Sequence, residues 1–240
     1  MIELKNVEFL RSSVEALSSF IPEGNFRFND KGIHFRAMDP SQVLLVDYMM
    51  DKAVFDSYGV EPCFVGINLD ELRKIVSRAM PNDNVSIIIS DSECKLSLNG
   101  ELERSFRLPL IDVSQEEVKL PEIKFDARIE INAKLLKEAL KDASLFSSSV
   151  VVRTKGDRLM LESKGSAGTL NVNSSQNNSV RVKAKADVVS KYSLSYLQNI
   201  VKEASSESTI VLELKSDSPV KVSYMIGKTE IRYYLAHMLL

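Results

Sequence analysis

Four stretches of the chain repeat one pattern of apolar residues. Each begins with a leucine, at Leu10, Leu72, Leu136 or Leu197, and places further apolar residues four and seven positions later. Residues at these offsets lie on one face of an α-helix, so the pattern predicts four amphipathic helices, each with one buried side. The leucines recur roughly every 60 residues, and a near-constant period indicates an internal repeat in the fold.

Basic residues accompany the apolar stripe on the opposite side of these helices. Positions one and five residues after each leucine point away from the stripe, because successive helical residues are turned by about 100°. Lysine or arginine occupies most of these positions and some of their neighbours: Arg11, Arg73, Lys74, Arg78, Lys137, Lys141 and Lys202. Glu15 and Ser77 occupy the fifth position in the first two helices. We therefore expect a mostly basic exposed side that is weaker in the first half of the chain.

The overall charge argues against a protein that binds nucleic acid with its whole surface. The 240 residues carry a formal net charge of −2, so the remaining surface must be net acidic if the helices are basic. The sequence lacks a long apolar run and a signal-peptide start, and we expect an intracellular, soluble protein. Cys63 and Cys94 are too far apart for a metal or redox motif and are predicted to be buried free thiols.

Short strands are predicted between the helices. Apolar alternation and turn residues predict, in the first half, helices at 4–20 and 69–80 and strands at 25–28, 33–38, 43–49, 64–67, 85–90, 95–98 and 104–111. The second half repeats this order, with helices at 133–144 and 195–204 and strands at 128–131, 150–154, 158–163, 169–173, 181–190, 209–215, 219–226 and 229–236.

This order predicts an α+β protein of two pseudo-equivalent domains, in which antiparallel sheets are covered on one side by two helices. Residues 1–111 form the first predicted domain and residues 127–240 the second. Residues 112–126 are acidic, contain Pro121 and follow neither period, so we expect an extended connector between the domains.

Four short sequences stand in order along the two halves: Ala37-Met38-Asp39-Pro40-Ser41-Gln42-Val43, Gly66-Ile67-Asn68-Leu69, Leu120-Pro121-Glu122 and Tyr233-Tyr234-Leu235-Ala236. In these motifs and their spacing, nearly the whole chain resembles the DNA sliding clamps of the proliferating cell nuclear antigen (PCNA) family, and its short C-terminus resembles the archaeal type. The resemblance implies a clamp fold and a six-domain ring of three subunits that encloses duplex DNA. The basic helix residues would then line the DNA channel and attract phosphates without reading sequence.

The resemblance also implies a role as a processivity factor in DNA replication and repair, with short peptides of partner proteins bound to the clamp. The implied partners are the replicative polymerase, flap endonuclease, DNA ligase and the clamp loader. By position, the implied peptide pocket is lined by Met38, Gln42, Val43, Leu45, Val118, Leu120, Phe125, Pro219, Tyr234 and Ala236.

In the same family, subunits join through an edge strand of the first domain and an edge strand of the second domain of the next subunit. The implied interface residues here are Arg104, Phe106, Leu108, Leu110, Thr169, Leu170 and Val172. Strand edges carry unpaired backbone groups that such pairing would satisfy.

The C-terminus departs from the family pattern. After Leu235 and Ala236 the family usually continues with proline and a charged tail, whereas this chain ends with His237, Met238, Leu239 and Leu240. The ending leaves open whether the ring holds three identical chains or this chain with different relatives. The expected location is the archaeal cytoplasm, at the nucleoid, or the nucleus if the protein is eukaryotic.

The sequence contains no pattern that indicates catalysis. It has no glycine-rich phosphate loop, and His34 and His237 lack neighbours that would make a catalytic or metal site. We therefore expect no enzyme, no metal and no cofactor. Two alternatives to a replicative clamp are a damage-checkpoint clamp subunit of the same fold and an enzyme with an unrecognised site on this fold.

Overall fold

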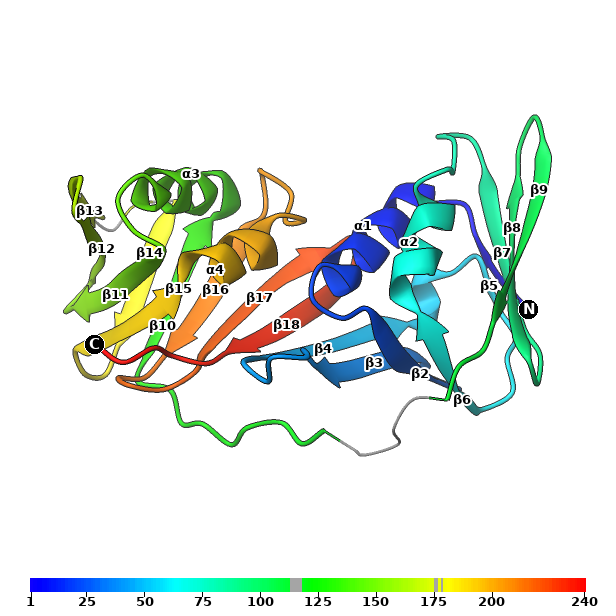
Figure 1. Ribbon diagram of the computed structural model, residues 1–240, viewed down its shortest axis with the longest axis horizontal. Helices are drawn as coiled ribbons and strands as arrows, with labels where there is room; N and C mark the ends of the chain where they lie inside the picture. The colour runs from blue at the N-terminus through cyan, green and yellow to red at the C-terminus, as the bar shows by residue number, and fades with distance from the viewer. Residues whose placement is uncertain (113–117, 175–176, 178) are drawn as a thin grey trace. The chain divides into compact units, whose positions relative to one another are not determined.

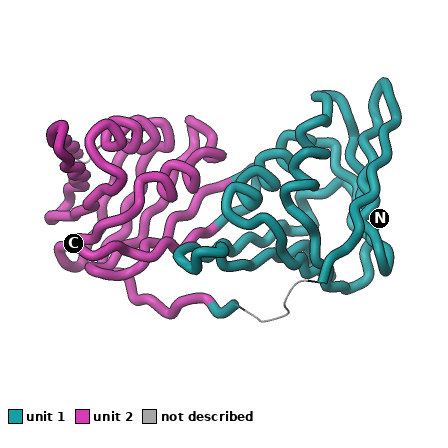
Figure 2. The backbone as a smooth tube through the Cα atoms, in the orientation of Figure 1, with its two compact units in different colours: residues 1–119, 226–231 teal, residues 120–225, 232–240 magenta. Residues whose placement is uncertain are grey.

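The computed structural model describes residues 1–112, 118–174, 177 and 179–240, and two compact units emerge from its backbone contacts. Unit 1 comprises residues 1–119 and 226–231, and unit 2 comprises residues 120–225 and 232–240 (Figure 2). Of the predicted connector, residues 113–117 lie outside the described residues.

Unit 1 contains two antiparallel sheets and two helices (Figure 1). One sheet has the order β5-β1-β7-β8-β9, and the strands of the other run in the order β4-β3-β2-β6. The strands are β1 (Ile2–Leu4), β2 (Glu23–Asn29), β3 (Gly32–Met38), β4 (Leu44–Asp51), β5 (Ser57–Tyr58), β6 (Cys63–Asn68), β7 (Asn84–Ile89), β8 (Glu93–Asn99) and β9 (Glu103–Pro109). The helices are α1 (Val7–Ser18) and α2 (Leu69–Val76), with a short 3-10 turn at Lys52–Val54.

Unit 2 repeats this plan. Its sheets have the orders β13-β12-β11-β15 and β14-β10-β16-β17. The strands are β10 (Ala127–Asn132), β11 (Ser149–Lys155), β12 (Arg158–Gly165), β13 (Gly168–Asn173), β14 (Val180–Ala184), β15 (Val188–Ser193), β16 (Thr209–Leu214) and β17 (Val220–Ile226), and β18 (Thr229–Leu235) is divided between the units. The helices are α3 (Ala133–Ser144) and α4 (Leu194–Val201). The predicted α+β class is confirmed.

The repeated apolar stripe forms the buried side of each helix, as predicted. All its members are buried: Leu10, Val14, Leu17, Leu72, Val76, Ala79, Leu136, Leu140, Ala143, Leu197, Val201 and Ala204. Each fully buried leucine contributes about 2 kcal/mol of transfer free energy. The stripe thus joins each helix pair to the sheets of its own unit.

Asparagine side chains start three of the four helices. Asn6, Asn68 and Asn132 each accept a hydrogen bond from the backbone N–H three residues later, which satisfies one of the unpaired donors at a helix N-terminus. Ser193 precedes α4 without making such a bond. Each asparagine cap contributes about 1 kcal/mol.

The start of the chain differs from the prediction. Residues 2–4 are strand β1 rather than helix, because Ile2 lies between Tyr58 of β5 and Ile87 of β7 in the five-stranded sheet. The helix begins only at Val7, after the cap at Asn6. Pairing with strands that are distant in sequence decided this segment, and local periodicity does not contain that information.

The predicted strand at 181–190 is also wrong as a single element. Val180–Ala184 pairs with β10, whereas Val188–Ser193 pairs with β11, which belongs to the other sheet of unit 2. The chain must cross from one sheet to the other between them. Both segments are rich in valine, so apolar pattern alone does not separate them.

Candidate nucleic-acid interface

The predicted channel residues belong to two helix pairs, α1 with α2 in unit 1 and α3 with α4 in unit 2 (Figure 1). Five of them lie within the helices, whereas Arg78 and Lys202 follow the last residues of α2 and α4. On α2, Arg73 and Lys74 are exposed and pair with the preceding acidic residues, at 3.9 Å between Arg73 and Asp70 and 2.6 Å between Lys74 and Glu71. Exposed ion pairs of this kind contribute little to stability, so the lysine or arginine can readily exchange its carboxylate for another anion. These two cations can therefore reach a phosphate.

Arg11 has a different environment. Its guanidinium donates to the carbonyl of Ala79, just beyond α2, at 2.7 Å and pairs with Glu8 at 2.5 Å. The last carbonyls of a helix lack partners within the helix, so Arg11 satisfies one beyond the end of α2. Arg11 thus holds α1 against the end of α2 and is only partly available to a ligand.

Lys137 occupies the equivalent position in unit 2 and has the same role. Its ammonium donates to the carbonyls of Lys202 and Ala204, beyond the end of α4, at 2.8 and 2.6 Å. Burial lowers the pKa of Lys137, and the nearby charge of Lys141 lowers it further against the opposing effect of Glu203. Sequence position alone groups Arg11 and Lys137 with the exposed cations, whereas the structure shows both donating to carbonyls beyond a helix end.

Lys141 and Lys202, the other two predicted channel residues of unit 2, are exposed. Lys141 pairs with Glu138 at 2.7 Å, and Lys202 lies 3.7 Å from Glu203. Lys134, in the first turn of α3, is also exposed but was not among the predicted residues. It lies two residues before Leu136, one heptad before Lys141, and extending the repeat backwards would have found it.

The predicted peptide-pocket residues are divided between the units. In unit 1, Leu45 is buried, Val43 and Val118 are half-buried, and Met38 and Gln42 are exposed. The buried carboxylate of Asp39 organises this loop by accepting hydrogen bonds from the backbone N–H groups of Val43 and Leu44 at 2.8 and 2.7 Å. Gln42 has a positive φ of 57° within the loop. The sequence around Asp39 therefore encodes a fixed turn that presents Met38 and Gln42.

In unit 2, Leu120, Phe125, Pro219, Tyr234 and Ala236 are all half-buried. Apolar side chains with partial exposure fit a surface that another group can cover. The C-terminal segment is tied to β15, because the backbone N–H of Met238 donates to the carbonyl of Lys191 at 2.7 Å.

Both strands of the implied subunit interface lie at sheet edges. β9 is the last strand of the five-stranded sheet, and β13 is the last strand of its sheet in unit 2. Phe106, Leu110, Leu170 and Val172 are half-buried, Leu108 is buried and Thr169 is exposed.

Arg104 of β9 makes its contacts within unit 1. Its guanidinium pairs with the buried carboxylate of Asp83 and donates to the carbonyl of Arg78, beyond α2, at 2.8 Å. The guanidinium of Arg104 therefore acts on the helix end, as that of Arg11 does.

Two family models match the chain. The model described as proliferating cell nuclear antigen, N-terminal domain, matches residues 1–128, and the model described as proliferating cell nuclear antigen, C-terminal domain, matches residues 119–238. The chain belongs to the PCNA family. The predicted family and the general reading as a sliding clamp are confirmed.

Similar proteins carry the corresponding names. The chain is 31% identical over 217 residues to DNA polymerase sliding clamp 1 of Thermococcus kodakarensis. The aligned region covers 89% of this chain and 87% of the relative. It is 30% identical over 238 residues to the DNA polymerase sliding clamp of Methanococcus vannielii, with 96% of each covered. A crystal structure of PCNA from Thermococcus kodakaraensis shares the clamp fold with a TM-score of 0.94 over 99% of both chains, at 24% identity.

The described residues contain neither a metal-binding cluster nor a membrane-spanning helix. No group of three or more His, Cys, Asp or Glu residues there could hold a metal ion. No helix in the same part of the chain has the length and apolar character needed to cross a membrane.

Proposed function

We propose that this chain is one subunit of a ring of three subunits that encircles duplex DNA and tethers replication and repair enzymes to it. Each subunit supplies two clamp domains, residues 1–111 and 127–240, joined by the connector at 112–126. The observation that carries the proposal is that both family domains present a helix pair with a buried apolar side and exposed lysine or arginine.

The exposed cations suit a channel around DNA. Arg73, Lys74, Arg78, Lys141 and Lys202 provide charge without the rigid, paired geometry that base reading needs. Such contacts attract the duplex in a salt-dependent, sequence-independent manner and permit sliding. Arg11 and Lys137 contribute mainly by fixing the helices that carry the other cations.

The ring closes through the edges of β9 and β13. We propose that β9 of one subunit pairs with β13 of the next, through Arg104, Phe106, Leu108, Leu110, Thr169, Leu170 and Val172. Since the two surfaces differ, the contact is head to tail, and rotation by one third of a turn produces a closed trimer. Pro109 at the end of β9 limits the length of the ladder.

The partner peptides bind to the ten pocket residues described above. We propose that a peptide of the replicative polymerase, flap endonuclease, DNA ligase or clamp loader covers the apolar side chains of the connector and its neighbours. The clamp performs no chemistry and needs no cofactor. It works at the nucleoid of an archaeal cell.

A second candidate is a mixed ring, either a heterotrimeric replication clamp or a damage-checkpoint clamp. The observation that favours it is the exposure of Leu239 and Leu240, which are 87% and 61% exposed. Two adjacent exposed leucines suit a specific protein contact.

The molar mass in solution separates the two candidates. Light scattering behind a sizing column, over a range of concentrations, should give a species near three times 26.9 kDa for a self-sufficient ring. A constant mass of one chain would instead favour the mixed ring, and addition of the missing relatives should then restore the trimer.

Charge reversal tests the channel. The double variants Arg73→Glu/Lys74→Glu in α2 and Lys134→Glu/Lys141→Glu in α3 should each weaken clamp-dependent primer extension at least about tenfold at moderate salt, because phosphate contacts are lost and repulsion is added. Lys155→Glu, at the exposed hairpin between β11 and β12, is the matched control. Equal effects of the control and the helix variants would contradict the proposed channel.

A further inference from the structure

In each unit, one strand edge is held at a single residue by a later segment of the chain. The segment after β9 holds β6 in unit 1, and the segment after β18 holds β15 in unit 2. In unit 1 the N–H of Ile111 donates to the carbonyl of Gly66 in β6 at 3.0 Å. In unit 2 the N–H of Met238 donates to the carbonyl of Lys191 in β15 at 2.7 Å. β6 and β15 occupy the same place in the repeated element order, so Gly66 and Lys191 are equivalent.

Unit 2 closes the rest of this edge with its own loop. Val189, two residues before Lys191, donates its N–H to the hydroxyl of Ser216 at 3.1 Å. Its carbonyl accepts from the N–H of Asp217 at 3.4 Å. The loop after β16 thereby satisfies both backbone groups that the strand edge presents.

In unit 1, the described residues provide no hydrogen-bond partner on this edge for the equivalent position, Phe64. Backbone groups alternate sides along a strand, so Phe64 presents its N–H and carbonyl on the same side as Gly66, away from β2. Neither group has a hydrogen-bond partner on that side among the described residues. The loop after β7 folds back on itself instead, with the N–H of Ser90 donating to the carbonyl of Glu93 at 3.0 Å.

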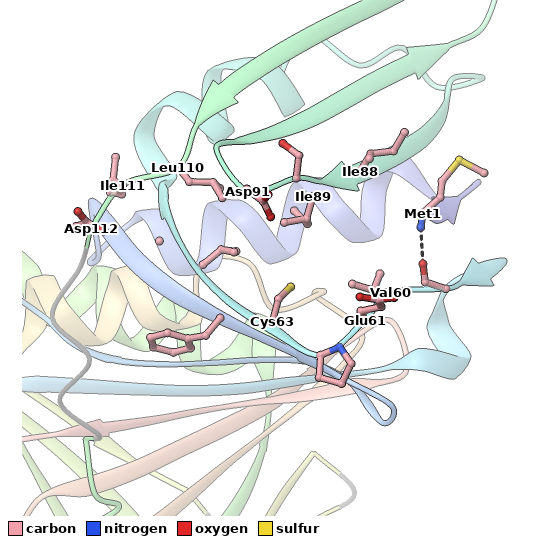
Figure 3. Close-up of a pocket in the computed structure, with 16 residues that line it drawn as sticks. Met1, Val60, Glu61, Cys63, Ile88, Ile89, Asp91, Leu110, Ile111 and Asp112 are labelled. Carbon is pink, nitrogen blue, oxygen red and sulfur yellow. Dashed lines mark hydrogen bonds between the residues drawn. The ribbon is translucent and has the colours of Figure 1, made fainter.

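A groove of about 630 Å³ lies along this open edge. Figure 3 shows Val60, Glu61 and Cys63 on one side of it, across from residues 88–91 and 110–112 on the other. Phe64 and Ile88, both of which line the groove, are 38% and 42% exposed. The groove combines a strand edge that no described residue covers at Phe64 with apolar side chains that a ligand could cover.

The charged side chains among the described residues that line the groove are all acidic. Its described lining residues include the carboxylates of Glu61, Asp91 and Asp112, all exposed, and no lysine or arginine. The amino group of Met1, which also lines it, donates to the carbonyl of Gly59. A ligand with basic side chains complements this surface.

We propose that this groove is a docking site for an extended segment of a partner protein, which adds a strand to β6 at Phe64 and places lysine or arginine near Glu61, Asp91 and Asp112. Strand addition supplies the missing hydrogen bonds, and alternation of side chains directs basic and apolar residues to opposite walls. The site is separate from the peptide pocket and the channel, and goes beyond the proposed function.

Capped, fluorescently labelled peptides test the proposal on the intact chain without DNA. A short peptide of alternating lysine and valine should bind saturably by fluorescence anisotropy. The same peptide with glutamate for lysine, or with alternate backbone nitrogens methylated, should bind at least about tenfold more weakly, since charge attraction or strand pairing is removed. Equal binding of the three peptides, or no saturable binding of the lysine peptide, would overturn the proposal.

Matched variants locate the binding. Phe64→Pro removes the groove-facing N–H, whereas Phe64→Ala removes only the ring, so the loss of affinity should be at least about tenfold for the first and smaller for the second. Asp91→Asn should weaken binding of the lysine peptide, and Glu101→Gln, in the hairpin between β8 and β9, should not. If Phe64→Pro fails to fold, the methylated peptide makes the same test with the unaltered protein.

The remaining outcomes identify other occupants. If the lysine peptide lowers the molar mass of the assembly to that of fewer chains, it has displaced a second copy of this chain from the groove. The proposal of a different partner protein would then be wrong. Clamp-dependent primer extension by Asp91→Asn should be unchanged, so failure of peptide binding is distinguishable from failure of the clamp function.

Discussion

The chain just beyond α2 and just beyond α4 is held by different charged groups, although the two helices are equivalent. Beyond α2, Arg11 and Arg104 donate to the carbonyls of Ala79 and Arg78, and the buried Asp83 pairs with Arg104. Beyond α4, Lys137 donates to the carbonyls of Lys202 and Ala204, and the uncharged hydroxyl of Tyr224 donates to the carbonyl of Ile200 in the last turn of the helix. The carbonyls at a helix end need partners, and this requirement is met by an ion-paired network in unit 1 and by one ammonium with one neutral hydroxyl in unit 2.

The difference shows that a basic residue at an equivalent position need not have an equivalent function. In the proposed function the exposed cations of these helices contact a polyanion. Arg11 and Lys137 instead donate to carbonyls beyond a helix end, which makes them less available for that contact. Because the network at the helix end in unit 1 depends on a buried ion pair, it should be the more sensitive to loss of one partner.

Asp83→Ala should have the largest effect. It leaves Arg104 with an uncompensated charge in a setting where its side chain is only 20% exposed, and breaking such a pair costs about 3–5 kcal/mol. Equilibrium unfolding in urea would measure the loss, with Glu101→Ala in the nearby exposed hairpin as control. A loss below about 1 kcal/mol would mean that the network in unit 1 is no more important than an exposed pair.

Lys137→Met should cost about 2 kcal/mol, because two carbonyls beyond α4 lose their donor. Arg11→Met should cost less, about 1 kcal/mol, since Arg104 still holds the same region in unit 1. Both free energies come from the same unfolding experiment. If the order were reversed, redundancy would not distinguish the two helix ends.

A second contrast concerns acid stability. In unit 1, Asp47 accepts hydrogen bonds from His34 at 2.9 Å and Arg36 at 2.8 Å. By register the equivalents of Asp47 and Arg36 in unit 2 are Asn171 and Glu162, which cannot form this cluster. Burial raises the pKa of Asp47, but the hydrogen bonds from His34 and Arg36 outweigh it and hold that pKa below its usual range.

Because the folded pKa of Asp47 is depressed, its stabilisation is fully present above the unfolded value of about 3.9 and is lost as the pH falls through the lower folded value. Asp47→Asn should therefore remove about 1–3 kcal/mol at pH 7 and flatten the acid limb of stability below about pH 4. Unfolding free energies measured from pH 7 downward would check this. An unchanged acid limb would assign the acid sensitivity to other carboxylates.

Ser193→Asn should have the smallest effect and the opposite sign. Three helices have an asparagine cap and α4 has none, so a cap should stabilise unit 2 by about 0.5 kcal/mol. Asn132→Ala should destabilise the same unit by about 1 kcal/mol. Thermal unfolding of both variants would measure the pair, and destabilisation by Ser193→Asn would show that its bond with Ser195 outweighs a cap.

Much of the fold could be predicted from the sequence, because each helix carries its own apolar period and most hairpins carry turn residues. α3 occupies residues 133–144, as predicted, and the whole stripe is buried. Strand β1 and the break between β14 and β15 could not be predicted, since pairing with distant strands decides both. Local pattern contains no record of such partners.

The sequence by itself determined four amphipathic helices, two similar halves, a basic side on the helices and membership of the PCNA family. Only the tertiary structure decided which cations stay exposed to a ligand. Arg11 and Lys137 instead donate to carbonyls that lie more than 60 residues away in the chain. The tertiary structure also decided that the strand edge at Val189 is closed, whereas that at Phe64 has no hydrogen-bond partner among the described residues. A side chain's identity is local, whereas the partners that satisfy its polar groups are set by the packing of the whole unit.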